Sequence, residues 1–233
     1  MSASPSLHSS ESRGIAAAGR RLVTDAPTRM FHGLFALSFI GAYLTADGER
    51  WRLLHVTLGY SFAGLLAFRL LYGLVGPRHA RLSALGRRLA GATAWLRALP
   101  AARTVSAIDW RRGQNLGMAL VVVSMMALVA PLALSGWATY EEWGGALSGD
   151  WLEDVHEFLG NTLLALALAH LGLIVLLSRL RRRNLALPML TGRIEGAGPS
   201  PVTHNRAWLA MALLAAVLAA LMAALIAFTA WPS

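Results

Sequence analysis

The stretch from Asp154 to Ser178 constrains the fold most strongly, because it is long and apolar enough to cross a bilayer as one helix. It carries two histidines, His156 and His170, which are fourteen residues apart. At about 100° and 1.5 Å per residue they return to nearly the same helix face, roughly 21 Å apart along the axis. An imidazole therefore stands near each side of the membrane. This predicts two stacked metal-centred cofactors whose other ligands come from elsewhere in the chain.

Composition indicates a polytopic membrane protein, because hydrophobic residues make up 56% of the 233 positions and the mean hydropathy is positive. The first twenty residues are polar and lack the apolar segment of a cleavable signal peptide. Membrane-spanning helices are expected at about residues 30–46, 53–75, 115–138, 154–178 and 207–231. We therefore predict an all-α fold, a transmembrane bundle with a four-helix core and one additional C-terminal helix.

The chain contains no cysteine. Disulfides, thiolate-bound iron–sulfur clusters and a thioether-linked haem are thereby excluded. Any haem in this chain must be held non-covalently, by histidine or methionine.

Arginine placement predicts the orientation in the membrane. The basic residues are all arginine, and most lie in the N-terminal tail, the 76–113 loop or the 179–206 segment. The positive-inside rule places these segments in the cytoplasm. The 137–153 loop has four acids and no base, so it faces outward, and the C-terminus follows the fifth helix to the periplasm. The net charge of +9 thus reflects orientation, and we expect membrane lipid rather than nucleic acid as a partner.

Three segments outside the spans complete the predicted organisation. Residues 1–21 are rich in Ser, Ala and Gly and are expected to form a disordered cytoplasmic tail, and residues 194–206 form a linker to the fifth helix. Within residues 82–99, leucines recur at helical spacing between arginines. That pattern is typical of an amphipathic helix on the cytoplasmic membrane surface, held by anionic lipid or, less favoured, docked to a partner.

The remaining membrane histidines can be placed by depth. His32 lies in the first turn of the first span, toward the cytoplasm, and His55 in the first turn of the second, toward the outside. By level, His55 pairs with His156 and His32 pairs with His170. Imidazoles approaching from different helices are what axial ligation of two haem irons requires. The competing interpretations are hydrogen-bonding core histidines, or a zinc or di-metal site, which would need mid-span carboxylates that the chain lacks.

Two arginines and two glycines fit the same interpretation. Arg69 lies fourteen residues after His55, near the inner level, where it can bind a propionate of the inner haem or instead reach to the cytoplasmic surface. Arg29 is a second propionate candidate. Gly59 and Gly160 each follow an outer-level histidine by one turn, so they leave room for a flat macrocycle or allow close helix packing.

Three stretches resemble the bacterial cytochrome b561 family, which includes the b-type cytochrome subunits of nickel–iron hydrogenases: DAPTRMFHGLFALSFIGAYLTA, LLHVTLGYSFAGLLAFRLLYGLVGPRHARL and LEDVHEFLGNTLLALALAHLGLIVLLS. The resemblance covers about residues 22–193 and implies four transmembrane helices that hold two b haems. Its ligand positions fall in RMFHG, LLHVTLGY, VHEFLGN and LALAHLG, which correspond here to His32, His55, His156 and His170. The fifth span, 207–231, has no counterpart in this core, and the outer loop is short compared with the hydrogenase subunits.

The resemblance implies electron transfer between a quinone pool and a partner redox protein by a multi-pass protein of the bacterial cytoplasmic membrane. A periplasmic c-type cytochrome or dehydrogenase is expected at the acidic outer loop, and quinone near one haem, with His79 as a candidate residue. With two histidines on each iron, we expect no open position for oxygen or substrate. Two alternatives remain open: a stand-alone oxidoreductase passing electrons from superoxide to quinone, and a haem-free transporter or assembly factor.

Overall fold

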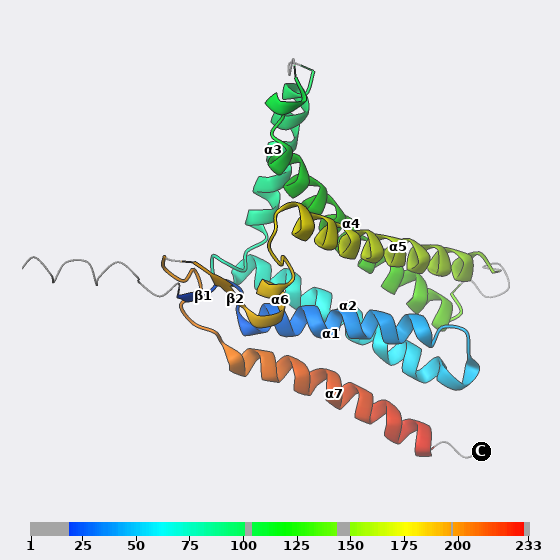
Figure 1. The fold of residues 1–233 in the computed structure, drawn as a ribbon. Coiled ribbons are helices and arrows are strands. Elements are labelled where there is room, and N and C mark those ends of the chain that lie inside the picture. Colours follow the sequence, from blue (N-terminus) through cyan, green and yellow to red (C-terminus); the bar gives the residue numbers. More distant parts are fainter. Residues whose placement is uncertain (1–18, 101–103, 144–149, 197, 231–233) are drawn as a thin grey trace, which may run out of the picture.

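The computed structural model describes residues 19–100, 104–143, 150–196 and 198–230, and its regular structure is almost entirely helical (Figure 1). The helices in chain order are α1 (Ala26–Leu44), α2 (Arg52–Val75), α3 (Ser83–Ala98), α4 (Trp110–Tyr140), α5 (Trp151–Leu180), α6 (Leu187–Thr191) and α7 (Ala207–Ala230). Two three-residue strands, β1 (Arg20–Leu22) and β2 (Arg193–Glu195), form an antiparallel pair. The predicted all-α membrane bundle is confirmed.

By length and composition, α4, α5, α7 and α2 with its preceding turn are apolar and long enough to cross a membrane. Helix α1 has 19 residues, carries Arg29 and His32, and is not among these four candidate spans. It packs along α2 and ends at Leu44, slightly before the predicted limit at residue 46. Its own crossing of the membrane stays a prediction.

Local sequence explains where the bundle helices begin and end. The Asp25 side chain caps α1 by accepting a hydrogen bond from the backbone N–H of Thr28 at 3.2 Å, and Pro27 fits the first turn. Asp109 caps α4 in the same way, at 3.0 Å from the N–H of Arg112, so α4 begins five residues before the predicted span. Helix α2 ends where Pro77 follows Gly76, because proline cannot continue the helix.

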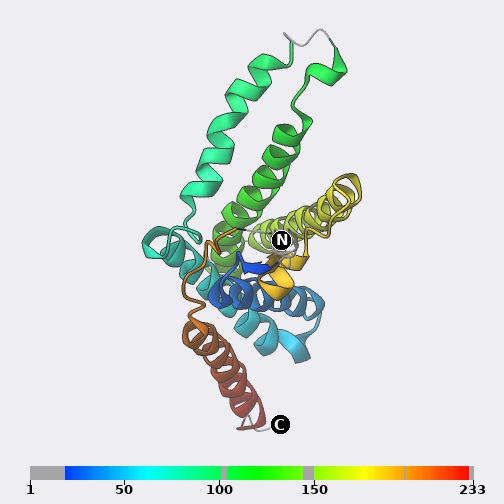
Figure 2. The same ribbon diagram turned by 60° about the vertical axis from the view of Figure 1, so that its left-hand side comes forward.

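The helices pack around two apolar clusters. The first joins α2 to the α4–α5 pair through Phe62, Leu66, Val129, Leu132 and Leu163. The second joins α1, α2 and α7 through Phe31, Leu34, Leu65 and Val217. Figures 1 and 2 show the resulting order, with α1 and α2 between the α4–α5 pair and α7. Helix α7 therefore covers the side of α1 that faces away from α5.

The predicted amphipathic helix over residues 82–99 is present as α3, and it packs against the beginning of α4. The Trp95 indole Nε1 donates to the Asp109 carbonyl at 2.9 Å, and its ring lies directly against Gly113. The two segments project from the bundle as a hairpin (Figure 2). Part of the apolar face of α3 is thus occupied by α4, and its contact with the membrane surface stays a prediction.

The polar segments at both ends of the core are more ordered than the sequence suggested. Of the predicted disordered tail, residues 1–18 lie outside the described residues, whereas Arg20 and Arg21 belong to β1. The linker after β2 is fastened to the same region, because Val202 N–H donates to the Leu22 carbonyl at 3.4 Å and Leu22 N–H to Ser200 Oγ at 3.1 Å. Backbone pairing across about 180 positions carries no side-chain signature, so a polar linker was the natural expectation.

Candidate functional site

The structure brings the predicted outer pair of histidines together. His55 on α2 and His156 on α5 have ring centres 6.0 Å apart, with the rings nearly perpendicular. Both rings line a cavity of about 440 Å³ between α1, α2, α4 and α5. Two imidazoles that each hold a metal at about 2 Å from a ring nitrogen have centres roughly 6 Å apart, so this spacing suits a shared metal ion.

Backbone carbonyls fix the orientation of both outer rings. His55 Nδ1 donates to the Ala42 carbonyl at 2.8 Å, and His156 Nδ1 donates to the Leu132 carbonyl at 3.0 Å, with Ser135 Oγ at 3.2 Å. A carbonyl oxygen only accepts hydrogen bonds, so Nδ1 carries the proton in each ring. The lone pair of Nε2 is then free to bind a metal, as in most histidine–metal sites.

Glycines shape the cavity beside these rings. A Cβ atom added at Gly136 would lie 2.7 Å from His156 Cε1, so the ring rests directly on the α4 backbone. Gly59 and Gly160 both line the cavity. A Cβ at Gly59 would meet nothing within 4 Å, and one at Gly160 only a Leu132 methyl at 4.0 Å. Both positions thus border open space that a flat prosthetic group can occupy.

Acidic and polar side chains surround the outer part of the same cavity. Asp47, Glu153 and Glu157 contribute three carboxylates to its lining. Tyr43 O–H donates to Asn161 Oδ1 at 2.8 Å, and the Asn161 amide donates to Glu157 at 3.3 Å. The predicted outer side of this cavity is therefore acidic, which attracts positively charged groups and repels anions.

The histidines of the predicted inner pair are more exposed to solvent than a fully buried pair would be. His32 on α1 is exposed and His170 on α5 is half-buried, and the two are close enough to interact electrostatically. His170 Nδ1 is buried and has no hydrogen-bond partner among the described residues. Unlike the outer imidazoles, His170 is therefore not oriented by a hydrogen bond from its Nδ1 to these residues.

The two arginines proposed for propionates both contact backbone carbonyls at the predicted cytoplasmic end. Arg69 donates from Nη1 to the Ala80 carbonyl at 3.1 Å. Arg29 donates from Nη1 to the Leu190 carbonyl in α6 at 3.2 Å. Each guanidinium has five N–H groups, so a single such bond leaves donors for another partner. Their role toward a propionate stays a prediction.

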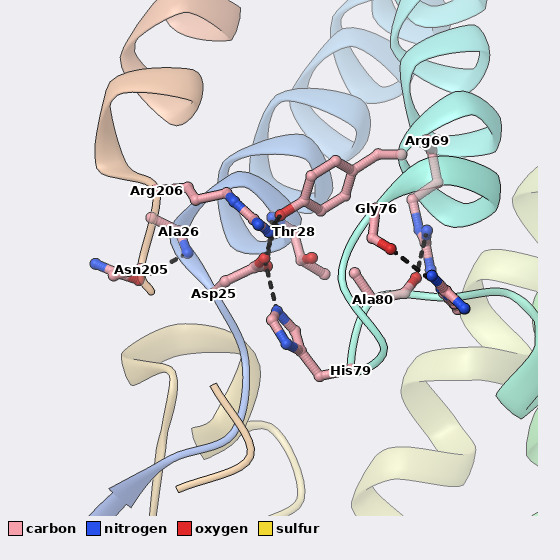
Figure 3. A network of polar contacts seen from close by, with 11 residues as sticks. Asp25, Ala26, Thr28, Arg69, Gly76, His79, Ala80, Asn205 and Arg206 are labelled. Carbon is pink, nitrogen blue, oxygen red and sulfur yellow. Dashed lines mark hydrogen bonds and ion pairs between the residues drawn. The ribbon is translucent and has the colours of Figure 1, made fainter. Parts of the chain in front are cut away.

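A buried carboxylate that the sequence showed only as a helix-start signal forms the centre of a polar network (Figure 3). Asp25 is fully buried, and its Oδ2 accepts hydrogen bonds from the Tyr72 hydroxyl and from His79 Nε2 at 2.9 Å. Burial acts to raise the pKa of Asp25, but the hydrogen bonds from Thr28, Tyr72 and His79 outweigh it and hold that pKa below its usual value. The carboxylate is therefore ionised at neutral pH, and the His79 side chain is hydrogen-bonded to it.

The fold and these sites define a class: helical membrane proteins in which histidines from different helices face one another around space for a prosthetic group. Within that class, the family model for prokaryotic cytochrome b561 matches residues 23–192, and the chain belongs to this family. Comparison with curated proteins and with solved structures gave no match. The protein is thus a membrane-embedded b-type cytochrome of electron transfer, and α7 lies beyond the matched residues.

The outer site fits the b-type haem that the family implies. Its two histidines line one cavity with ring centres 6.0 Å apart, and Gly59 and Gly160 border open space in the same cavity. Because the chain has no cysteine, the haem is held without a covalent bond.

Proposed function

We propose that the protein carries electrons across the bacterial inner membrane between the quinone pool and a periplasmic redox partner. In this proposal it holds two b haems, the outer one between His55 and His156 and the inner one between His32 and His170. The observation that carries it is the outer pair, because both Nδ1 atoms are anchored on carbonyls while both rings face one cavity.

The side chains of the protein then have defined tasks. When bound through two histidines, a haem supplies reversible one-electron chemistry without an open position for oxygen. The Ala42 and Leu132 carbonyls orient the outer imidazoles and raise their basicity. We assign Arg69 to an inner propionate, since its remaining N–H groups lie at the cytoplasmic end of α2.

Charge around the outer cavity supports a basic periplasmic partner such as a c-type cytochrome. Asp47, Glu153 and Glu157 line the cavity, and Glu141 and Glu142 follow α4 on the same outer side. These carboxylates attract a positively charged protein surface and slow the approach of an anion. They therefore disfavour superoxide as the electron donor, and with it the stand-alone oxidoreductase.

Haem content of the full chain tests the ligand assignment. The wild type, purified in detergent, is expected to contain about two protohaems per chain by pyridine haemochrome and a reduced-minus-oxidised spectrum. Alanine at His55 or His156 should remove the outer haem, and alanine at His32 or His170 the inner one. His204→Ala is the matched control, because His204 is exposed and lies before α7. Unchanged haem content in all four variants would contradict the assignment.

The partners are tested separately in proteoliposomes. A quinol analogue should reduce the haems, and a basic c-type cytochrome should reoxidise them from the outer face. The latter rate should fall as salt is raised, because screening weakens attraction between exposed charges. A reoxidation rate that does not change with salt concentration would argue against docking at the acidic outer surface.

A further inference from the structure

Helix α7 lies outside the family match, yet it packs on the part of α1 that carries His32. Val217 is buried, and Leu213, Leu214 and Leu221 surround it on the same face of α7. Their partners on α1 include Phe31 and Leu34, which are buried at 8% and 9% exposure and stand on either side of His32 in the sequence. The orientation of this turn of α1 therefore depends on α7.

The linker before α7 is joined to the first residues of α1. The N–H of Ala26 donates to the Asn205 carbonyl at 3.2 Å and to its side-chain Oδ1 at 2.9 Å. Arg206 donates from Nη1 to the Tyr72 hydroxyl at 3.5 Å, and that hydroxyl donates to Asp25 (Figure 3). The end of the linker thus reaches both α1 and α2 at one point.

The buried and ionised Asp25 requires hydrogen-bond partners at fixed positions around it. It has no exposed surface, so its charge is stabilised only by the groups that touch it. Because those groups come from α2, the 76–82 loop and α1 itself, they fix the position and rotation of the α1 terminus. His32 follows Asp25 by two turns, roughly 10 Å along the axis, so its direction is set by this terminus.

The outer pair is held by other means. Its surroundings are the cluster of α2, α4 and α5, in which α7 takes no part. Helix α1 contributes there mainly through its far end, where the Ala42 carbonyl accepts from His55 and where Phe39 and Tyr43 line the cavity. Of the two histidine pairs, only the inner one therefore includes a residue on a helix turn that packs against α7.

We propose that α7 and its linker are positioning elements for His32, which hold α1 in the orientation that presents this imidazole toward His170. The inference rests on the proposed haem ligation and gives the fifth helix a role at one of the two haems only. In this proposal α7 acts on His32 through α1, and it has no role in positioning His55 or His156.

The test compares two double variants of the full chain. Leu213→Ala/Val217→Ala removes apolar contacts with α1, whereas Met211→Ala/Leu218→Ala changes side chains that are 59% and 50% exposed on α7. Haem content and a potentiometric titration of the haem absorbance are measured for both. The first variant should retain the inner haem about tenfold more weakly, or shift its midpoint, while the outer component and the control stay as in the wild type. The inner component is identified as the one missing from His32→Ala.

Arg206→Gln and Tyr72→Phe keep the inference testable if the first variant does not fold. The first removes the contact of Arg206 with Tyr72, and the second removes the hydroxyl that contacts both Arg206 and Asp25, without emptying the interface. A change confined to the inner component supports the proposal. Equal changes in both components, or none in either, overturn it and leave α7 a general stabiliser or an anchor. If the wild type binds no haem, or His32→Ala keeps both, the haem assignment itself fails, which is a separate result.

Discussion

Gly136→Ala is the most informative single substitution, because the structure specifies what the added methyl group meets. Its Cβ would lie 2.7 Å from Cε1 and 3.0 Å from Nδ1 of His156. Carbon atoms in ordinary contact are about 3.5–4.0 Å apart, so the ring must move by about 1 Å. That displacement takes Nδ1 away from the Leu132 carbonyl, which it now contacts at 3.0 Å.

The expected magnitude follows from two contributions. Overpacking of a close contact destabilises by about 1–3 kcal/mol, and the lost hydrogen bond by about 1 kcal/mol. Together they amount to about 2–4 kcal/mol, and since each 1.4 kcal/mol is a factor of ten, the outer haem should be held at least about 30-fold more weakly.

The assay follows haem transfer from detergent-solubilised protein to an excess of a haem-scavenging protein. Gly136→Ala should release one haem much faster than the wild type, and the other haem at the same rate. Gly117→Ala is the matched control, because it lies on the same helix and a Cβ there meets nothing within 4 Å. Release of the outer haem at the wild-type rate from Gly136→Ala would refute the assignment of His156 as an axial ligand.

Three further outcomes are expected. Gly59→Leu should leave the fold intact, because its Cβ meets no protein atom within 4 Å, yet block uptake of the outer haem, as haem spectra will show. Asp25→Asn should lower stability at neutral pH. Since the folded pKa of Asp25 is depressed, its stabilisation is present above the unfolded value of about 3.9 and lost as pH falls through the folded value, so the two unfolding curves should converge in acid. Ser135→Ala should shift the potential of the outer haem alone, because Ser135 Oγ lies 3.2 Å from His156 Nδ1; equal shifts in both haems would contradict this.

Much of the architecture could be predicted because helices have a fixed period and membranes a fixed thickness. Spacing alone put His156 and His170 on one face, and arginine counts set their levels relative to His55 and His32. The structure then brings His55 and His156 to 6.0 Å. Depth in a bilayer depends only on position along each helix, so the sequence predicts it well.

The groups that the sequence did not indicate depend on contacts between distant or backbone atoms. Tyr72 and His79 lie 47 and 54 positions from Asp25, and no periodicity links them. The Ala42 and Leu132 carbonyls that orient the outer rings belong to residues whose side chains are unremarkable methyl and isobutyl groups. The place of α7 beside α1 was equally hidden, because an almost uniformly apolar helix shows no preferred face.

Helix α5 contributes one histidine to each pair, and several of its apolar side chains are exposed, among them Phe158, Leu168, Leu171, Val175 and Leu176. A neighbour that pressed on this helix within the bilayer would move both imidazoles as one body, since a continuous helix transmits displacement along its length. The other two histidines share no helix, because His32 belongs to α1 and His55 to α2. If the two proposed haems are bound, lateral assembly against α5 would therefore change the potentials of both together, whereas a neighbour on α7 would affect the inner one first.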